Sequence, residues 1–477
     1  MDGGSSPHLP AQARDLEVIG LTADSREVKP GFLFAALSGM REDGRRFVAD
    51  ALAKGAAAIL TAEALDTPVA APVIVDPNPR RRLALMAARF HAPQPKTLAA
   101  VTGTNGKTSV TVFLRQIWEK LGYRAASFGT IGIFGTGIAR PGSLTTPDPV
   151  TLHRELAELA QAGIDHVALE ASSHGLDQFR LDGLALKAAA FTNLTRDHLD
   201  YHRDMEAYFT AKSRLFTELL PPSGTAVFNI DARETARLSR LSKARGQTIL
   251  SYGRNPAADL WLSDAKPEGI GQRIVFSGFG EKREMVLPLL GTFQAYNALG
   301  AACLAIACGG APSAVLDAIA ALTGVPGRMQ RIGNAPVLVD YAHTPDALET
   351  ALNALRPFCQ GRLIVVFGCG GDRDPGKRPQ MGALAEKLAD IVFVTDDNPR
   401  TEDAATIRRA ILATCPKARE IGDRAAAISE AIRMMGAGDV LLIAGKGHER
   451  GQIIGNKILP FDDAETAAAI LAAGGKA

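Results

Sequence analysis

The sequence is poor in cysteine and has no long apolar run. Its five cysteines include no C-x-x-C pair, which argues against a zinc site and against a disulfide framework. No apolar run approaches the roughly 20 residues that a membrane-spanning helix needs. Residues 1–10 lack the basic start and apolar core of a secretory signal. These absences predict a protein of the reducing cytoplasm.

An excess of one charge is also missing. The 53 Lys and Arg residues against 51 Asp and Glu leave a formal net charge of +2, so bulk electrostatics give no argument for nucleic acid or an anionic membrane as a partner. A hydrophobic content of 46% with 22% charged residues is typical of a folded globular protein rather than a disordered one. A chain of 477 residues predicts about three domains.

One glycine-rich turn stands out. Residues 102–109 read Thr-Gly-Thr-Asn-Gly-Lys-Thr-Ser, between an apolar run at 98–101 and a segment with helical periodicity that Gly122 ends. A strand, a glycine turn and a helix N-terminus build an anion site, because free backbone N–H groups and the helix dipole point into the turn. Val101 replaces the first glycine of the common eight-residue pattern, so the loop is a shorter variant. We interpret it as a nucleoside triphosphate site; the alternative is a tight turn with an incidental lysine.

Two turn-rich stretches divide the chain, at 91–96 after a predicted helix at 81–90, and at 324–328. Throughout, short apolar runs alternate with helical patterns, which predicts an α/β fold with mostly parallel sheets. In the middle of the chain, strands are predicted at 98–101, 167–169 and 188–191. The predicted segments are 1–96, 97–328 and 329–477.

In the last segment, each of four predicted strands is followed by a polar cluster. Open α/β sheets bind ligands outside the carboxyl ends of their strands. Solvated loops explain any one cluster, but four at one sheet edge indicate a crevice. The strands are predicted at 337–339, 363–367, 391–394 and 440–444, and the clusters lie at 340–343, 368–374, 396–400 and 445–449.

Two features of the middle segment suggest a metal. Glu170 ends a predicted strand, where a carboxylate is suited to Mg²⁺; a surface acid is the alternative. His198 and His202 form an H-x-x-x-H pair, a spacing seen in zinc sites. Because no third nitrogen or sulfur ligand is near in sequence, we favour one histidine beside a magnesium site over zinc.

Lys212 occupies an apolar position. It shares one predicted helix face with Tyr208, Leu215 and Phe216. A buried ammonium is costly, and its pKa falls so that the neutral amine becomes available. Either the side chain reaches the rim of the apolar face, or a neutral amine takes up CO₂ as a carbamate and becomes a metal-binding anion. Periodicity leaves both open.

Together these features resemble the Mur ligases, the ATP-dependent amide-forming enzymes of peptidoglycan synthesis, and among them the branch that adds the third residue of the stem peptide. The resemblance runs along nearly the whole chain. Its motifs are D-S-R at 24–26, T-G-T-N-G-K-T at 102–108, T-T-P-D at 145–148, E-A-S-S-H-G-L at 170–176, D-H-L-D-Y-H at 197–202, A-K at 211–212, G-T-F-Q-A-Y-N at 291–297, G-R-M at 327–329 and the four clusters of the last segment.

The resemblance implies a UDP-sugar-binding domain at 1–96, a central P-loop ATP-binding domain at 97–328 and a Rossmann-like amino-acid-binding domain at 329–477. It implies a cytoplasmic ligase, acting as a monomer, that joins UDP-MurNAc-L-Ala-D-Glu to meso-2,6-diaminopimelate through an acyl phosphate. Such a reaction makes a peptidoglycan precursor and so serves cell-wall biogenesis, cell shape and cell division. ATP and Mg²⁺ are the implied cofactors, with a carbamate on Lys212.

The resemblance also implies roles for individual residues. The catalytic residues are Lys107, Glu170, His198 and Lys212. The metal ligands are Thr108, Glu170, His198 and carbamylated Lys212. The ATP-binding residues are Gly103, Thr104, Asn105, Gly106, Lys107, Thr108, Ser109, Asn297, Arg328 and Asp340. The UDP-MurNAc-dipeptide contacts are Ser25, Thr145, Thr146, Ser172, Gln178 and Arg180.

The identity of the third amino acid can be argued from the charge that its far end carries. Diaminopimelate differs from lysine by a second carboxylate, and the planar fork of arginine suits a carboxylate better than an ammonium does. Arg400 stands in a D-N-P-R loop, as in diaminopimelate-adding members, and lysine-adding relatives lack it. The other residues implied for this pocket are Arg373, Asp397, Asn398, Pro399, Gly445 and Glu449, the last of which is expected to accept the distal ammonium.

The chain departs from the family pattern at Met40, Arg41 and Glu42, near the expected sugar-nucleotide contacts, and at Leu144, where a polar residue is frequent. Three alternatives remain: a P-loop switch or transport ATPase, a lysine-adding ligase, and a folylpolyglutamate synthetase. The Arg400 loop argues against the second of these, and the 24–26 motif argues against the third.

Overall fold

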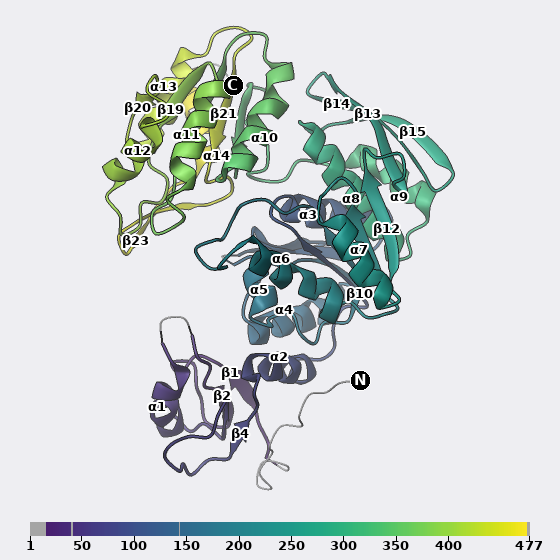
Figure 1. Ribbon diagram of the computed structural model, residues 1–477, viewed down its shortest axis with the longest axis vertical. Helices are drawn as coiled ribbons and strands as arrows, with labels where there is room; N and C mark the ends of the chain where they lie inside the picture. Colours follow the sequence, from purple (N-terminus) through teal and green to yellow (C-terminus); the bar gives the residue numbers. More distant parts are fainter. Residues whose placement is uncertain (1–15, 40–41, 143, 475–477) are drawn as a thin grey trace.

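The computed structural model describes residues 16–39, 42–142 and 144–474. Three sheets follow one another along the chain and form an elongated molecule, with the first sheet at one end, the second in the middle and the third at the other end (Figure 1). The predictions for residues 1–10 and for Met40 and Arg41 lie outside the described residues. Within the described ranges, no helix is long and apolar enough to cross a membrane.

The first unit is a four-stranded parallel sheet with strands in sequential order. The predicted helix at 81–90 is confirmed as α2, which starts earlier because Asn78 caps it and Pro79 takes its first turn. The elements are β1 (Gly20–Thr22), β2 (Phe32–Ala35), α1 (Val48–Ala53), β3 (Ala58–Thr61), β4 (Val73–Val75) and α2 (Pro79–Phe90).

The second unit is an eleven-stranded sheet in the order β15-β14-β13-β12-β11-β10-β5-β9-β6-β7-β8. The strands from β13 to β6 in this order run parallel to one another, and β14 and β15 at one end and β7 and β8 at the other continue the sheet through antiparallel pairings. The strands are β5 (Thr97–Thr102), β6 (Ala125–Gly129), β7 (Gly132–Gly135), β8 (Ile138–Pro141), β9 (His166–Glu170), β10 (Leu186–Phe191), β11 (Thr225–Asn229), β12 (Thr248–Gly253), β13 (Leu260–Glu268), β14 (Gly271–Gly278) and β15 (Glu281–Leu287).

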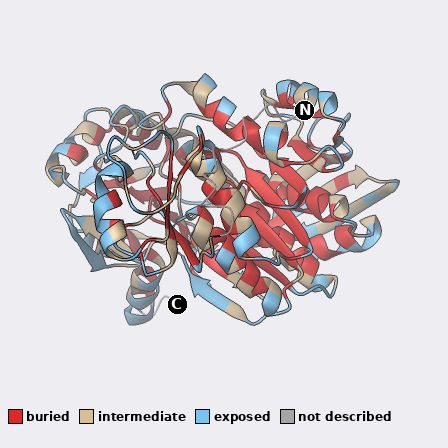
Figure 2. Cartoon of the chain, turned by 90° about the horizontal axis from the view of Figure 1, so that it is seen from below, coloured by how far each residue is buried: buried red, intermediate tan, exposed pale blue. Residues whose placement is uncertain are grey.

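Helices cover both faces of this sheet, so its central strands are apolar on both sides. In β5, Ala99 and Val101 belong to the core beneath α3 and α8, while Leu98 and Ala100 belong to the core beneath α4 and α6. Figure 2 shows the buried strands between helices that keep exposed outer faces. The helices are α3 (Lys107–Lys120), α4 (Pro149–Gln161), α5 (Ser173–Asp177), α6 (Met205–Arg214), α7 (Thr235–Ala244), α8 (Thr292–Ala307) and α9 (Pro312–Ala318).

The third unit is a six-stranded sheet in the order β16-β17-β21-β18-β19-β20, parallel except at β16. Helices α10, α11 and α12 cover one face, and α13 and α14 cover the other. A separate hairpin, β22–β23, follows β21. The elements are β16 (Gln330–Arg331), β17 (Val337–Asp340), α10 (Pro345–Leu355), β18 (Leu363–Phe367), α11 (Lys377–Leu388), β19 (Ile391–Val394), α12 (Ala404–Leu412), β20 (Arg419–Glu420), α13 (Arg424–Met434), β21 (Val440–Ala444), β22 (Gly451–Ile454), β23 (Lys457–Pro460) and α14 (Asp463–Ala473).

The mostly parallel α/β class is confirmed, and each strand predicted for the middle and last segments is present. Strands β17, β21, β18 and β19 are parallel neighbours in one sheet, so their carboxyl ends meet at a single edge. In the middle unit, β5 and β9 are parallel neighbours, which brings the glycine turn beside Glu170. These two edges carry the candidate site.

Candidate active site

The glycine turn joins β5 directly to α3. Gly106 precedes the helix with φ +88°, a left-handed conformation that favours glycine. At Gly103, with φ +143°, a Cβ atom would lie 1.9 Å from Thr192 Oγ1, so a side chain has no room. Helix α3 then begins at Lys107 with its free N–H groups at the turn. The local structure is the anion-binding arrangement that the sequence predicts.

A cavity of about 400 Å³ lies over this turn. Each residue predicted to bind ATP lines this cavity except Gly103, which belongs to the turn but not to the cavity wall. Arg328 Nη2 donates to Thr108 Oγ1 at 3.2 Å, which links the segment before the third sheet to the start of α3. The predicted residues on the cavity wall are Thr104, Asn105, Gly106, Lys107, Thr108, Ser109, Asn297, Arg328 and Asp340.

Lys107 is folded back onto its own loop. Its Nζ donates to the carbonyl oxygens of Gly103 at 3.0 Å and Thr104 at 2.9 Å. Burial lowers the pKa of the Lys107 ammonium, while the charges of Glu170 and Asp197 oppose that shift. The lysine is therefore oriented at the loop before an anion binds. A bound anion would then stabilise the charged form of its side chain.

Glu170 is buried at the end of β9, so the surface-acid alternative is wrong. Thr130 holds both carboxylate oxygens: its N–H donates to Oε1 at 2.8 Å and its hydroxyl to Oε2 at 3.0 Å. No sequence pattern indicated Thr130, which lies in the short loop between β6 and β7. Glu170 and Thr130 line the same cavity as Thr108. The hydroxyl and carboxylate oxygens there are ligands that suit Mg²⁺.

Lys212 is only 1% exposed, so the alternative in which it reaches the rim is wrong. Its Nζ donates to Gly103 O at 2.8 Å and lies 4.4 Å from the centre of the Tyr208 ring. Burial, together with the charge of Lys107, lowers the pKa of the Lys212 amine well below its usual value. Lys212 is not among the residues that line the cavity over the turn; its amine lies behind Gly103.

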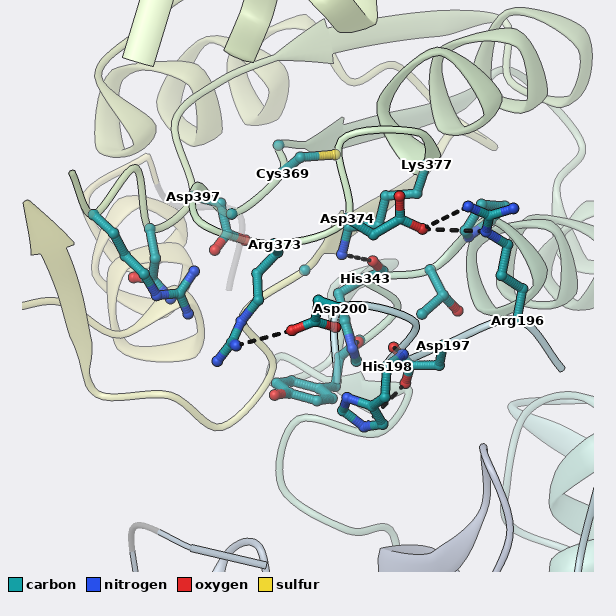
Figure 3. Close-up of a pocket in the computed structure, with 18 of the residues that line it drawn as sticks. Arg196, Asp197, His198, Asp200, His343, Cys369, Arg373, Asp374, Lys377 and Asp397 are labelled. Atoms are coloured by element: carbon teal, nitrogen blue, oxygen red, sulfur yellow. Dashed lines mark hydrogen bonds and ion pairs between the residues drawn. The ribbon is translucent and has the colours of Figure 1, made fainter. Parts of the chain in front are cut away.

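A second cavity, of about 190 Å³, lies at the carboxyl edge of the third sheet and faces the loop after β10 (Figure 3). All four polar clusters contribute to it, which confirms the predicted crevice. Two ion pairs connect its walls: Arg196 with Asp374 at 3.0 Å and Arg373 with Asp200 at 3.4 Å. Of the residues predicted for the amino acid, Pro399 does not line this cavity. Those that do are Arg373, Asp397, Asn398, Arg400, Gly445 and Glu449.

Arg400 has a left-handed backbone, with φ +52°, and the β22–β23 hairpin holds it there. Its N–H donates to Ile453 O at 3.0 Å, and its carbonyl accepts from the N–H of Gly455 at 2.7 Å. The guanidinium Nη1 donates to Gly371 O at 2.8 Å. One guanidinium nitrogen thus donates to the backbone, and the others have no hydrogen-bond partner among the described residues. The hairpin contribution had no signal in the sequence.

Asn398 is held from two sides. Its Oδ1 accepts from Lys446 Nζ at 3.0 Å and from the N–H of Ile453 at 3.0 Å. Its Nδ2 donates to Glu449 Oε2 at 2.8 Å, and Lys446 donates to the same oxygen at 3.0 Å. Lys446 is completely buried. The sequence placed Lys446 in a polar cluster but did not indicate that it neutralises Glu449 and orients Asn398.

Four residues line both cavities and so form the boundary between them: Asp197, His198, Tyr341 and His343. Asp197 Oδ1 accepts from the N–H of His198 at 2.8 Å, and Oδ2 lies 3.4 Å from His198 Nε2. Burial lowers the pKa of His198 to about 3 although Asp197 opposes the shift. The histidine is therefore neutral near pH 7, the form that can act as a metal ligand.

The H-x-x-x-H spacing does not produce a zinc site. His198 and His202 lie in an irregular loop rather than on a helix. Within residues 16–39, 42–142 and 144–474, no three His, Cys, Asp or Glu side chains are grouped closely enough to hold a metal ion. The five cysteines are free. A metal at Glu170 would depend on hydroxyl, phosphate or carbamate oxygens as further ligands.

Five of the six residues predicted for the UDP-MurNAc-dipeptide gather beside Glu170, and Ser25 lies in the first unit. Thr146 Oγ1 donates to Glu170 O at 2.9 Å, and Arg180 Nη1 donates to Thr146 O at 2.7 Å. Arg180 Nη2 donates to Gln178 Oε1 at 2.7 Å. Ser172 caps α5, and Thr145 Oγ1 lies 2.8 Å from Thr130 Oγ1. Leu144 is exposed.

Comparison with known proteins gives matches along the chain. Three family profiles cover it: "Mur ligase family, catalytic domain" over residues 17–91, "Mur ligase middle domain" over 101–305 and "Mur ligase, glutamate ligase domain" over 327–447. A curated relative from Bradyrhizobium diazoefficiens, named UDP-N-acetylmuramoyl-L-alanyl-D-glutamate–2,6-diaminopimelate ligase, is 53% identical over 463 residues. That match covers 96% of this chain and 95% of the relative.

Solved structures agree with this. One structure of a UDP-N-acetylmuramoyl-L-alanyl-D-glutamate–2,6-diaminopimelate ligase is 36% identical with a TM-score of 0.70, and the match covers 96% of this chain and 95% of that one. MurF ligase from Thermotoga maritima, in complex with ADP, is 20% identical with a TM-score of 0.66 and covers 96% of this chain and 98% of its own. At that identity the second likeness shows the fold alone.

Proposed function

The chain belongs to the Mur ligase family, and from this premise we propose that it is the ATP-dependent ligase that joins UDP-MurNAc-L-Ala-D-Glu to meso-2,6-diaminopimelate, the reaction of the MurE branch. The observation that carries the proposal is the position of Arg400, in a cavity that shares its boundary residues with the cavity over the glycine turn. The proposed phosphate site and the proposed carboxylate-binding arginine thus lie in two adjoining cavities. The names of the relatives described above support the same reaction.

The geometry supports a two-step path. A substrate carboxylate attacks the γ-phosphate of ATP, which gives an acyl phosphate and ADP; the amine of the amino acid then displaces phosphate. Charge develops on phosphoryl oxygens, so the N-terminus of α3 and the Lys107 ammonium stabilise the first step. Arg328, which reaches Thr108, adds a second cation at this end of the cavity.

Mg²⁺ fits the donor set beside the turn. Bound there, it would neutralise part of the charge on the phosphate oxygens. We propose Thr108 and Glu170 as ligands of one ion, and Glu170, His198 and carbamylated Lys212 as ligands of a second. The two hydrogen bonds from Thr130 orient Glu170 and leave lone pairs on both oxygens for a metal.

The carbamate is part of the proposal because Lys212 is a buried amine with a strongly lowered pKa. A neutral amine adds to CO₂ through its nitrogen lone pair and releases one proton, so a cation becomes an anion. An anion at this place would also relieve the repulsion between Lys212 and Lys107. The amine remains in contact with Gly103 O, directly behind the phosphate loop.

The same proposal covers the amino acid. Arg400 would bind the distal carboxylate of diaminopimelate, with Arg373 as a further cation of the cavity. Glu449 already accepts from Lys446 and Asn398 through Oε2, so only Oε1 remains to receive the distal ammonium. Asp397, Asn398, Pro399 and Gly445 would shape this end of the pocket.

We further propose the division of labour along the chain: residues 1–96 bind the UDP-sugar, 97–328 bind ATP and 329–477 bind the amino acid. Ser25, Thr145, Thr146, Ser172, Gln178 and Arg180 would contact the UDP-MurNAc-dipeptide. The nucleotide contacts would be Gly103 to Ser109 with Asn297, Arg328 and Asp340. The enzyme would act as a cytoplasmic monomer.

The test is an amide-ligation assay with UDP-MurNAc-L-Ala-D-Glu, ATP, Mg²⁺ and either meso-diaminopimelate or lysine. We expect tripeptide only with diaminopimelate, and phosphate release only when the sugar nucleotide and the amino acid are both present. Phosphate release from ATP alone at the full rate would indicate a switch or transport ATPase instead. Equal product with lysine would overturn the assignment of Arg400.

A further inference from the structure

His343 is a histidine at the boundary of the two cavities, and the proposed reaction has not used it. It lies between β17 and α10 and is half-buried. It lines the amino-acid cavity and the cavity over the glycine turn, and Figure 3 shows it among the residues that line the former. An amine that passes from one cavity to an acyl phosphate in the other must pass this boundary.

The tautomer of His343 is fixed by its backbone. Nδ1 lies 2.8 Å from the carbonyl oxygen of Tyr341, which can only accept, so Nδ1 carries the hydrogen. The lone pair of the neutral ring is then on Nε2. Within the described residues, Nε2 has no hydrogen-bond partner. Because this atom is not fully enclosed by protein, it is open to the cavity. Lys377 fixes the same segment by donating from Nζ to His343 O at 2.7 Å.

The other boundary residues are already engaged. Asp197 accepts from the His198 backbone and faces the His198 ring, and His198 is a proposed metal ligand. Burial raises the pKa of the Tyr341 phenol, which removes it as a base near neutral pH. His343 is the one boundary side chain with a basic atom that is both oriented and free.

We propose that His343 Nε2 is the general base that takes a proton from the incoming ammonium group of the amino acid. This rests on the proposed ligase function and adds a catalytic residue to it. The ammonium gives one proton to Nε2; the freed nitrogen lone pair forms the C–N bond at the acyl carbon. The C–O bond to phosphate breaks with its electron pair on the phosphate, which takes the second amine proton. The imidazolium returns its proton to water.

The charges around His343 favour this role. Burial lowers its pKa, and the cations Lys377 and Arg328 act in the same direction, while Asp197 and the hydrogen bond to Tyr341 oppose them. The ring is therefore neutral at pH 7 and ready to accept a proton. Asp197 then faces the imidazolium once it forms, and stabilises it.

The experiment separates the two chemical steps in His343→Gln. We expect ADP formation in a single turnover to stay within a few-fold of the unchanged enzyme, while amide formation with diaminopimelate at pH 7 falls by roughly 10²- to 10⁴-fold. Hydroxylamine, which is mostly neutral at pH 7 and needs no base, should be converted to the hydroxamate at the unchanged rate. His91→Gln, in the linker after α2, is the matched control and should leave both steps unaltered.

The pH profile gives a second readout. Amide formation by the unchanged enzyme should level off once His343 is neutral, whereas the variant should keep rising with pH as the free amine becomes more abundant. Equal losses with diaminopimelate and hydroxylamine, or an unchanged amide rate, would overturn the proposal. If His343→Gln does not fold, His343→Asn serves for the same comparison. Failure of the ligase proposal itself is recognisable separately, because the unchanged enzyme would then make neither amide nor hydroxamate.

Discussion

Thr130 donates a hydrogen bond to each carboxylate oxygen of Glu170, from its backbone N–H to Oε1 at 2.8 Å and from its hydroxyl to Oε2 at 3.0 Å. The two residues are 40 positions apart. Thr130 directly follows β6 and Glu170 ends β9, and these two strands are parallel neighbours. A carboxylate fixed in this way cannot rotate away from the cavity wall. The hydroxyl of Thr130 also lies 2.8 Å from that of Thr145, which connects the proposed metal ligand to the proposed sugar-nucleotide contacts.

Thr130→Val tests this relationship. The backbone N–H bond to Glu170 remains, but the hydroxyl bond to Oε2 is lost, so the carboxylate is less well oriented. We expect the Mg²⁺ concentration for half-maximal ligation to rise by about 10- to 100-fold, the usual effect of removing a group that orients a metal ligand. The rate should be measured across a Mg²⁺ titration. Thr130→Ser keeps the hydroxyl and should behave like the unchanged enzyme; an unaltered Mg²⁺ dependence in the valine variant would contradict the role.

Arg400→Ala tests the amino-acid pocket. Removing a charge-assisted, fork-shaped donor should lower kcat/KM for diaminopimelate by about 10²-fold or more, since such bonds contribute roughly 1.5–3 kcal/mol and an unpaired ligand carboxylate costs further free energy. The KM for ATP should change less than twofold. Arg409→Ala, at an exposed position of α12, is the control. Equal turnover of diaminopimelate by the Arg400 variant would refute the pocket assignment.

Lys212→Ala tests the carbamate. We expect no ligation, because the variant lacks both the amine and any anion that it forms with CO₂. Added bicarbonate should not restore activity, whereas a short-chain carboxylic acid should restore part of it by filling the vacated space with a carboxylate. A carbamate resonance seen with ¹³C-labelled bicarbonate should disappear in the variant and persist in Lys243→Ala, a change at an exposed residue of α7. Full activity without Lys212 would rule the carbamate out.

Acid stability should report on buried His153. Its Nε2–H donates to Asp182 O at 3.0 Å, and burial lowers its pKa to about 4. The unfolded chain, with a histidine pKa of about 6.5, takes up a proton first as the pH falls. Stability present above pH 6.5 is therefore lost between about pH 6.5 and 4, and the loss from this group amounts to about 2 kcal/mol at pH 5.

Urea unfolding at pH 7.5 and pH 5.0 measures this effect. The unchanged protein should lose more free energy of unfolding on acidification than His153→Gln, which cannot take up the proton. Burial also lowers the pKa of His91, at a partly exposed position, so His91→Gln is expected to remove a smaller part of the acid sensitivity than His153→Gln does. Identical acid sensitivity of the unchanged protein and the His153 variant would show that His153 is not held neutral in the folded state.

Local patterns predicted most of the elements around the site. The apolar run at 98–101, the glycines and the helical periodicity after Lys107 gave β5, the turn and α3, since each depends on neighbours within a few residues. The four strands of the last segment and the polar clusters after them were predicted for the same reason. Because parallel strands end at one sheet edge, their meeting in a crevice followed from the fold class.

The sequence restricted the position of Lys212 to two alternatives but did not decide between them. Helical spacing placed it on an apolar face, but either a rim position or a buried amine satisfied that spacing. Two contacts fix the buried position. The amine donates to Gly103 O, which is 109 residues away in the chain, and it lies over the Tyr208 ring. A contact between a helix and a turn of a distant strand has no period in the sequence, and so the pattern could not reveal it.

The sequence by itself determined where strands, helices and the phosphate loop lie, because periodicity and turn chemistry act between near neighbours. It also determined which chemical groups stand at the strand ends. Tertiary structure alone decided how those groups are used: Thr130 on Glu170, Lys446 between Asn398 and Glu449, and the open nitrogen of His343. The contacts of Thr130 with Glu170 and of Lys446 with Asn398 join segments that are remote in the chain, and Nε2 of His343 is open because of the cavities that the fold forms around it. In all three cases burial and hydrogen-bond geometry, rather than residue spacing, set the outcome.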